Sequence, residues 1–138
     1  DLVQLPLSLF DQRLLQDGTL ARLSEGGTAI HARSLYLQGL LLTPAAQWPP
    51  WVSPEVRAHQ HALETLALER GCRLIDLALG FAREQEDLES VVIGVCSRQE
   101  LAELSAAWSL TSPLQKIEWR YWALNDQIFL DPRRWPNL

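Results

Sequence analysis

A short polar stretch, residues 33–39, carries the residue types best suited to bind a ligand. It reads Arg-Ser-Leu-Tyr-Leu-Gln-Gly and follows a β-like run that starts with residues 28–31. Guanidinium, hydroxyl and amide groups at the carboxyl end of a strand lie where α/β folds gather their ligands. The expected ligand is therefore an anion, such as a phosphate or a nucleotide.

A second candidate anion site follows the β-branched run at residues 90–93. Gly94 ends that run, and Ser97 and Glu100 have the spacing of a capping box, in which each side chain binds a backbone N–H group at the start of a helix. Free N–H groups at a helix start attract phosphate. Any α/β unit has such a turn, so residues 94–98 are weak evidence on their own.

Other polar residues leave two interpretations open or argue against a metal. Gln4 is the only polar residue of the expected strand 2–5, where it either hydrogen-bonds neighbouring backbone or points at a ligand. His59 and His61 diverge on a helix, which predicts surface histidines rather than a metal pair. Cys72 and Cys96 form no CxxC motif, which indicates separate reduced thiols in a cytosolic compartment.

The elements that would position these residues alternate between strand and helix. Strands are expected at 2–5, 28–31 and 90–93, and helices at 19–24, 54–70, 74–83, from 98 onward and at about 114–125. Strand, helix, strand is the order of a parallel crossover. The helix 54–70 is expected to bury Val56, Leu63, Leu66 and Ala67 and to leave Gln60 outside that stripe. The loop from Trp48 to Trp51 either is fixed by aromatic packing or forms a flap over a site.

Composition fits one globular domain. The chain has 138 residues, 47% of them hydrophobic, with a net charge of −5 and scattered arginines. No basic patch for nucleic acid or an anionic membrane is present, and neither a signal peptide nor an apolar run long enough to span a bilayer is found. We expect a cytoplasmic protein. The chain opens on Asp1 and contains no Met, so we expect its beginning to be missing.

Three blocks together resemble the carboxyl-terminal part of the aldo-keto reductase family. They are Val3-Gln4-Leu5-Pro6 with Phe10-Asp11-Gln12-Arg13, then Ala32-Arg33-Ser34-Leu35 with Gln38-Gly39-Leu40-Leu41, then Val92-Ile93-Gly94-Val95-Cys96-Ser97 with Glu100-Leu101 and Glu103. The ending Asp131-Pro132-Arg133-Arg134-Trp135-Pro136 resembles bacterial members. The resemblance implies strands six to eight of a (β/α)₈ TIM barrel. Residues 1–138 would be a single partial-barrel segment of class α/β, with about three βα units, parallel strands and a C-terminal helix.

The resemblance also implies a nicotinamide cofactor, NADP or NAD. Gln4 would bind the carboxamide and Arg33 would lie beside the nicotinamide ring. The pyrophosphate would be held by Ser34, Leu35, Leu37, Gln38 and Gly39, and the adenosine with its 2′-phosphate by the turn after the third strand, at Gly94, Ser97, Arg98, Glu100, Glu103 and Leu104. Glu100 stands where relatives often carry a polar or basic residue and Leu104 where an asparagine is usual, so the choice between NADP and NAD stays open.

The family's catalytic aspartate, tyrosine, lysine and histidine lie on earlier strands and have no counterpart in this chain. We therefore expect a fragment that binds the cofactor but is inactive alone. Its open sheet edges favour self-association or a complementing amino-terminal fragment. The alternative is a non-catalytic α/β assembly or regulatory module, in which the polar strand ends only pack and hydrogen-bond.

Overall fold

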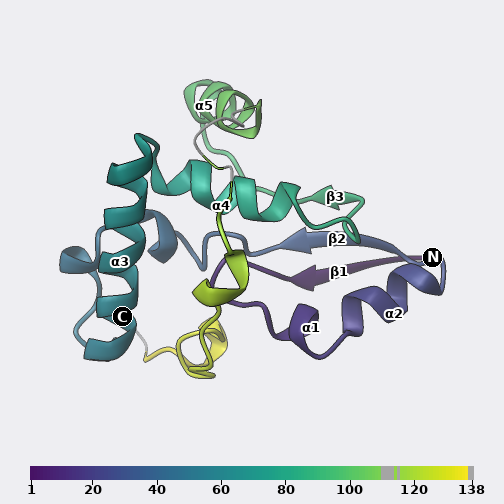
Figure 1. Cartoon of the computed structure of the whole chain (residues 1–138), viewed down its shortest axis with the longest axis horizontal. Helices are drawn as coiled ribbons and strands as arrows, with labels where there is room; N and C mark the ends of the chain where they lie inside the picture. Colours follow the sequence, from purple (N-terminus) through teal and green to yellow (C-terminus); the bar gives the residue numbers. More distant parts are fainter. Residues whose placement is uncertain (110–113, 115, 137–138) are drawn as a thin grey trace.

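The computed structural model, which describes residues 1–109, 114 and 116–136, contains a three-stranded parallel sheet in the order β1-β2-β3 (Figure 1). The strands are β1 (Leu2–Pro6), β2 (Ala29–Arg33) and β3 (Ser90–Val91). The register pairs Gln4 with His31 and Pro6 with Arg33, so the carboxyl ends of β1 and β2 lie side by side. The predicted parallel α/β arrangement is confirmed as an open sheet.

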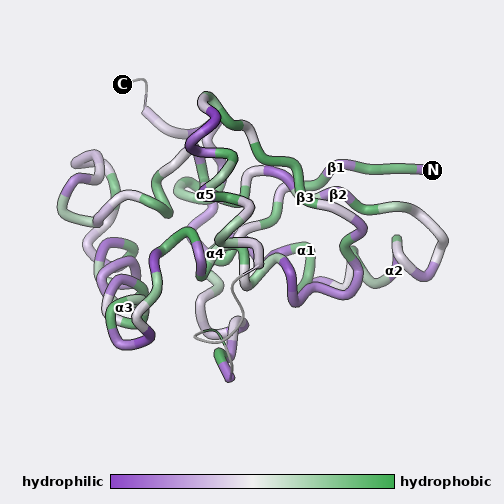
Figure 2. The backbone as a smooth tube through the Cα atoms, turned by 90° about the horizontal axis from the view of Figure 1, so that it is seen from above, coloured by the Kyte–Doolittle hydropathy of each residue, from purple (hydrophilic) through white to green (hydrophobic). Residues whose placement is uncertain are grey.

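Helices α1 (Arg13–Gln16) and α2 (Thr19–Glu25) connect β1 to β2, whereas α3 (Pro54–Arg70) and α4 (Leu74–Arg83) connect β2 to β3. Helix α5 (Arg98–Ser109) follows β3 and packs against α4. Seen from above in Figure 2, α1, α2 and α4 lie on the same side of the sheet. Ile30 and Ala32 are buried on that side, while Leu2 and Gln4 are exposed on the other face.

Helix α3 begins and ends where its sequence predicts. The Ser53 hydroxyl accepts a hydrogen bond from the Val56 N–H at 3.3 Å, and Pro54 occupies the first turn. Gly71 ends the helix in the left-handed region, at φ 63°. The predicted place of Gln60 outside the buried stripe is wrong, because this residue is fully buried and its amide Nε2 donates to the carbonyls of Leu41 and Thr43.

The expected helix at 114–125 is also wrong for the described residues of that range, which form turns and a 3₁₀ segment at Trp119–Trp122. Besides its short local hydrogen bonds, the backbone here bonds to the segment after β1. Gln12 Nε2 donates to the Trp119 carbonyl, and the Leu124 N–H donates to the Phe10 carbonyl, both at 2.8 Å. Residues 113 and 115 lie outside the described part of the chain.

The third strand is shorter than expected, since pairing covers Ser90–Val91 and not residues 90–93. Only His31 and Ala32 of β2 have Cα partners on β3. Gly94 is therefore exposed in the connection to α5 and not directly at a strand end.

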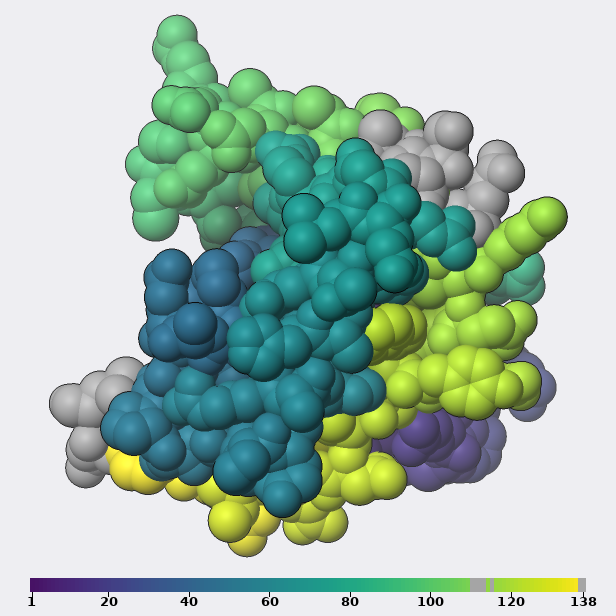
Figure 3. Space-filling view, turned by 60° about the vertical axis from the view of Figure 1, so that its left-hand side comes forward, coloured from purple at the N-terminus to yellow at the C-terminus, as the bar shows by residue number. Residues whose placement is uncertain are grey.

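The tail, residues 116–136, covers one side of the molecule. In the space-filling view its yellow-green surface borders both the teal surface of α3 and the purple surface of the first residues (Figure 3). Phe129 packs against Phe10 with ring centroids 6.4 Å apart, and Trp122 packs against His59 at 5.4 Å. His59 is thus partly buried in this contact, contrary to its prediction as a surface residue, whereas His61 is exposed.

No helix within the described residues is both long enough and apolar enough to cross a membrane.

Candidate functional site

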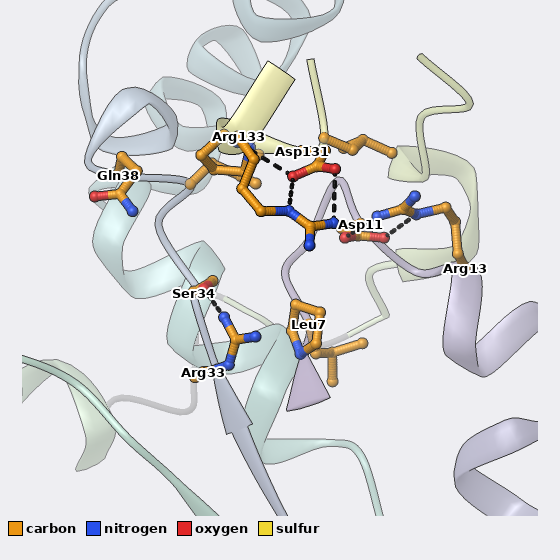
Figure 4. Close-up of a pocket in the computed structure, with 12 residues that line it drawn as sticks. Leu7, Asp11, Arg13, Arg33, Ser34, Gln38, Asp131 and Arg133 are labelled. Carbon is orange, nitrogen blue, oxygen red and sulfur yellow. Dashed lines mark hydrogen bonds and ion pairs between the residues drawn. The ribbon is translucent and has the colours of Figure 1, made fainter. Parts of the chain in front are cut away.

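A cleft of about 300 Å³ opens at the carboxyl ends of β1 and β2, a volume at the lower end of the range for small-molecule sites (Figure 4). Three segments form it: the residues after β1, the loop after β2, and the tail. The lining residues are Pro6, Leu7, Asp11, Arg13, Arg33, Ser34, Leu37, Gln38, Leu130, Asp131, Pro132 and Arg133.

The loop after β2 has an unusual backbone. Ser34, Leu37 and Gln38 all have positive φ, at 62°, 46° and 57°, and Gly39 follows at 90°. Only glycine reaches this region without strain, and each of the other three residues costs on the order of 1 kcal/mol or more. The buried side chains of Leu35, Leu37 and Leu41 fix the loop in the core. Strain of this kind accumulates where a backbone is shaped for a ligand.

Arg33 is the last residue of β2 and its side chain is exposed at the mouth of the cleft. Its Nη1 donates to the Ser34 hydroxyl at 3.2 Å, its only hydrogen bond with the described residues. The remaining guanidinium donors are therefore available to an anionic ligand.

Two ion pairs stand on the other walls of the cleft. Arg13 donates through Nε and Nη2 to the two carboxylate oxygens of Asp11, both at 2.8 Å. Arg133 binds Asp131 in the same way, at 2.8 and 2.9 Å. The hydrogen bond from Arg133 lowers the pKa of Asp131 to about 2, so this carboxylate stays charged over the physiological range. The hydrogen bond to Asp11 raises the pKa of Arg13, and the nearby charge of Asp131 adds to that rise.

The structure brings four of the predicted cofactor residues together, since Arg33, Ser34, Leu37 and Gln38 all line the cleft. Leu35, which is buried in the core, and Gly39 belong to the same loop but do not line the cleft. Gln4 lies on the exposed face of β1, outside the lining residues.

The second predicted set lies apart from the cleft. Gly94, Ser97, Arg98, Glu100 and Glu103 are all exposed and none of them lines it. The Ser97 hydroxyl accepts from the Glu100 N–H at 3.1 Å, as the capping box predicts, while the Glu100 carboxylate accepts from the Cys96 N–H and not from Ser97 itself. This carboxylate places a negative charge at the helix start, which weakens the turn as an anion site.

The loop with Trp48 and Trp51 has the contacts of packed structure. Trp48 Nε1 donates to the carbonyls of Leu40 and Thr43, both at 2.9 Å, and its ring lies 5.2 Å from Phe129. Trp51 packs on Trp135 at 5.3 Å. Neither tryptophan lines the cleft, so the aromatic-packing interpretation fits these residues.

Sequence reasoning missed the two ion pairs as parts of the site. The signal was present as a repeated spacing, Asp11-Gln12-Arg13 and Asp131-Pro132-Arg133, in which an acid and an arginine two residues apart can form a fork. Nothing in the sequence shows that segments 120 residues apart meet at one cleft, since only the packing of the tail decides that.

Comparison with protein-family models finds none that matches the chain, and comparison with curated proteins finds no match either.

Proposed function

We propose that this chain is the cofactor-binding carboxyl-terminal part of an aldo-keto reductase and that its strands are the last ones of a (β/α)₈ barrel. It binds NADP or NAD through the cleft at the ends of β1 and β2. The observation that carries the proposal is the loop of residues 34–39, which directly follows β2 and Arg33 at the cleft and has positive φ at Ser34, Leu37, Gln38 and Gly39.

The physical argument is the match between this loop and a diphosphate. Parallel strands direct the turns after them to one edge, where ligands of α/β proteins bind. Arg33 supplies a positive charge with unused donors, and Ser34 and Gln38 supply a hydroxyl and an amide at the same place. The diphosphate and the adjoining nicotinamide end of the cofactor both lie at this cleft in our proposal.

The adenosine end receives weaker support. Glu100 holds its carboxylate at the start of α5, where a 2′-phosphate would have to lie, and like charges repel. Arg98 is the exposed cation next to it. The choice between NADP and NAD therefore stays open in our proposal.

The chemistry of hydride transfer is assigned to residues outside this chain. Burial raises the pKa of Tyr36 to about 12, so its hydroxyl is poorly suited to give up a proton near neutral pH. The proposed role of the chain is to hold the cofactor while another segment supplies the proton donor.

The same proposal includes a partner for the sheet. Both outer edges of the sheet lack a neighbouring strand among the described residues, and Leu2, Val92 and Val95 expose 56%, 43% and 41% of their surface near those edges. Open apolar edges favour pairing with another strand. We propose self-association, with a complementing amino-terminal segment as the other source of that strand.

A non-catalytic α/β assembly module is the second candidate. It is favoured by the bare sheet face, on which Gln4 lies exposed beside His31 and outside the cleft.

Titration with NADPH and NADH, followed by tryptophan fluorescence, tests the proposal. We expect saturable quenching with both, and binding weakened at least fivefold by Arg33→Gln. Arg22→Gln on α2 is the matched control, because it removes the same charge from an exposed site away from the cleft. If neither dinucleotide gives saturable quenching, the assembly module is the better account. Carbonyl reduction by the chain alone would contradict the assigned division of chemistry.

A further inference from the structure

We infer that Arg13 and Arg133 join Arg33 to form a site for a phosphoryl group, with one arginine from each wall of the cleft. Arg13 comes from the start of α1, Arg33 from the end of β2, and Arg133 from the tail. In Figure 4 the three guanidinium groups surround the opening above Leu7. This inference rests on the proposed function in one respect, since it concerns the same cleft.

The ion pairs leave donors for such a ligand. Arg13 and Arg133 each use Nε and Nη2 to bind their aspartate, and neither Nη1 makes a hydrogen bond to a described residue. Arg33 uses Nη1 on Ser34, which leaves Nε and Nη2. Each wall of the cleft therefore presents at least one unused N–H group, and a phosphoryl group has oxygens to accept several of them.

The charges of the cleft also suit one anion. Three guanidinium groups and two carboxylates line it, so it carries a net positive charge of one. The whole chain, by contrast, carries −5. A local positive site in an acidic protein attracts an anion selectively to that place.

The aspartates act by holding the arginines and not by binding the ligand. A two-point carboxylate fork fixes the plane of a guanidinium group, which reduces the entropy that the side chain loses when it binds. Both ion pairs line the same cleft (Figure 4), and the charge of Asp131 contributes to the raised pKa of Arg13. The tail is therefore part of the binding wall.

Two sources of phosphoryl group fit this chemistry: the diphosphate of the dinucleotide, and a phosphate carried by a substrate. The cleft encloses about 300 Å³ and has apolar sides at Leu7, Leu37 and Leu130. Phosphate at the arginines would leave the organic part of the ligand against these leucines.

Isothermal titration with inorganic pyrophosphate, at low salt, tests the inference. We expect saturable binding by the unmodified chain, weakened at least fivefold by Arg133→Gln and by Arg13→Gln. Arg134→Gln is the matched control, because this exposed neighbour of Arg133 does not line the cleft. The Arg133 and Arg13 side chains are 88% and 41% exposed, so their loss leaves the core intact, which circular dichroism checks.

Equal affinities of Arg133→Gln and Arg134→Gln for pyrophosphate, or no binding by the unmodified chain, would overturn the inference. The failure of this inference can be distinguished from the failure of the proposed function.

NADH binding that is sensitive to Arg33→Gln but not to Arg133→Gln would support the dinucleotide proposal and reject the three-arginine site. Pyrophosphate binding without NADH binding would keep the phosphoryl site and reject the dinucleotide. If both bind, displacement of pyrophosphate by NADH assigns the site to the cofactor, and simultaneous binding assigns it to a phosphorylated substrate.

Discussion

Tyr36 lies in the loop that forms the cleft, yet its hydroxyl group is buried without a hydrogen-bond partner among the described residues. A buried hydroxyl with no partner loses its hydration and gains nothing in return. Ionisation would be more costly still, which is why burial raises the pKa of this tyrosine from 10.0 to about 12.

This residue predicts a specific alkaline behaviour. Between pH 10 and 12 the unfolded chain ionises Tyr36 and the folded chain does not, so stability is retained below pH 10 and lost as the pH rises toward 12. The Tyr36→Phe protein is expected to lose less free energy of unfolding between pH 10 and 12, because it has no hydroxyl at this position to ionise. At neutral pH the substitution should leave the free energy of unfolding unchanged or raise it by up to about 1 kcal/mol, because it removes an unpaired buried hydroxyl.

Urea unfolding measured from pH 8 to 11 checks this expectation. Tyr121→Phe is the control, since it removes an exposed hydroxyl from the tail. If Tyr36→Phe and Tyr121→Phe change the alkaline decrease in the free energy of unfolding equally, burial of Tyr36 is not the cause of that decrease.

Gln60 shows why single buried polar residues escape sequence reasoning. On a helical pattern it belongs with the solvated residues of α3, but the carbonyls of Leu41 and Thr43, after the cleft loop, lie within hydrogen-bond distance of its amide. A buried carbonyl without a donor is costly, and the Gln60 amide donates to both, sharing the Thr43 carbonyl with Trp48 Nε1. The two carbonyls lie 19 and 17 residues away from Gln60 in the sequence, so no local pattern indicates that this residue is buried.

At the scale of elements, α4 is the helix against which the tail is positioned. It is buried almost all round, and Gly80 lies beside the side chains of Leu114 and Trp119. A Cβ atom at Gly80 would clash with the Leu114 side chain and would lie 3.6 Å from Trp119 Cζ2. A glycine lowers the intrinsic helix propensity of α4, but only a residue without a side chain leaves room here for Leu114.

We expect Gly80→Val to lower the free energy of unfolding by about 1–3 kcal/mol through overpacking, although valine is the better helix former of the two. Ala58→Val on the exposed side of α3 is the control and should cost about 0.5 kcal/mol, the propensity difference alone. Urea unfolding of both variants gives the comparison. A Gly80→Val protein as stable as the unmodified one would show that the tail does not pack closely on α4.

Elements with their own local signals were the ones that the sequence predicted well. The bounds of α3 follow from Ser53, Pro54 and Gly71, whose side chains or backbone freedom act within the helix itself. The expected helix at 114–125 failed because its backbone groups bond to Phe10 and Gln12, far away in the sequence. In this segment, tertiary contacts outweigh the local preference for a helix.

At the scale of the whole molecule, the sheet is covered on one face and open at both edges within the described residues (Figures 1 and 2). Such a surface favours association, because unpaired strand edges bind other strands. We predict that light scattering in solution gives a mass above the 15.6 kDa of one chain.

Leu2→Lys on β1 should shift that equilibrium toward the monomer, since a charge on an edge strand opposes pairing. Leu68→Lys is the matched control, because Leu68 is 82% exposed but lies on α3, away from the sheet edge. A single species of monomer mass at all concentrations, with the unmodified chain, would contradict the prediction.

The sequence by itself determined the order of the three strands and of the helices between them, the parallel sheet and the polar loop after β2. These depend on hydrophobic periodicity, caps and turn residues that act over a few positions. It placed Arg33, Ser34 and Gln38 at a strand end, where the structure has the cleft. Only the tertiary structure decided that the tail closes this cleft with Asp131 and Arg133 and that the turn at Gly94 to Glu103 stays outside it. The physical reason is that a wall built from residues 11 and 131 depends on long-range packing, here of Phe129 against Phe10, and such contacts leave no periodic trace in the sequence.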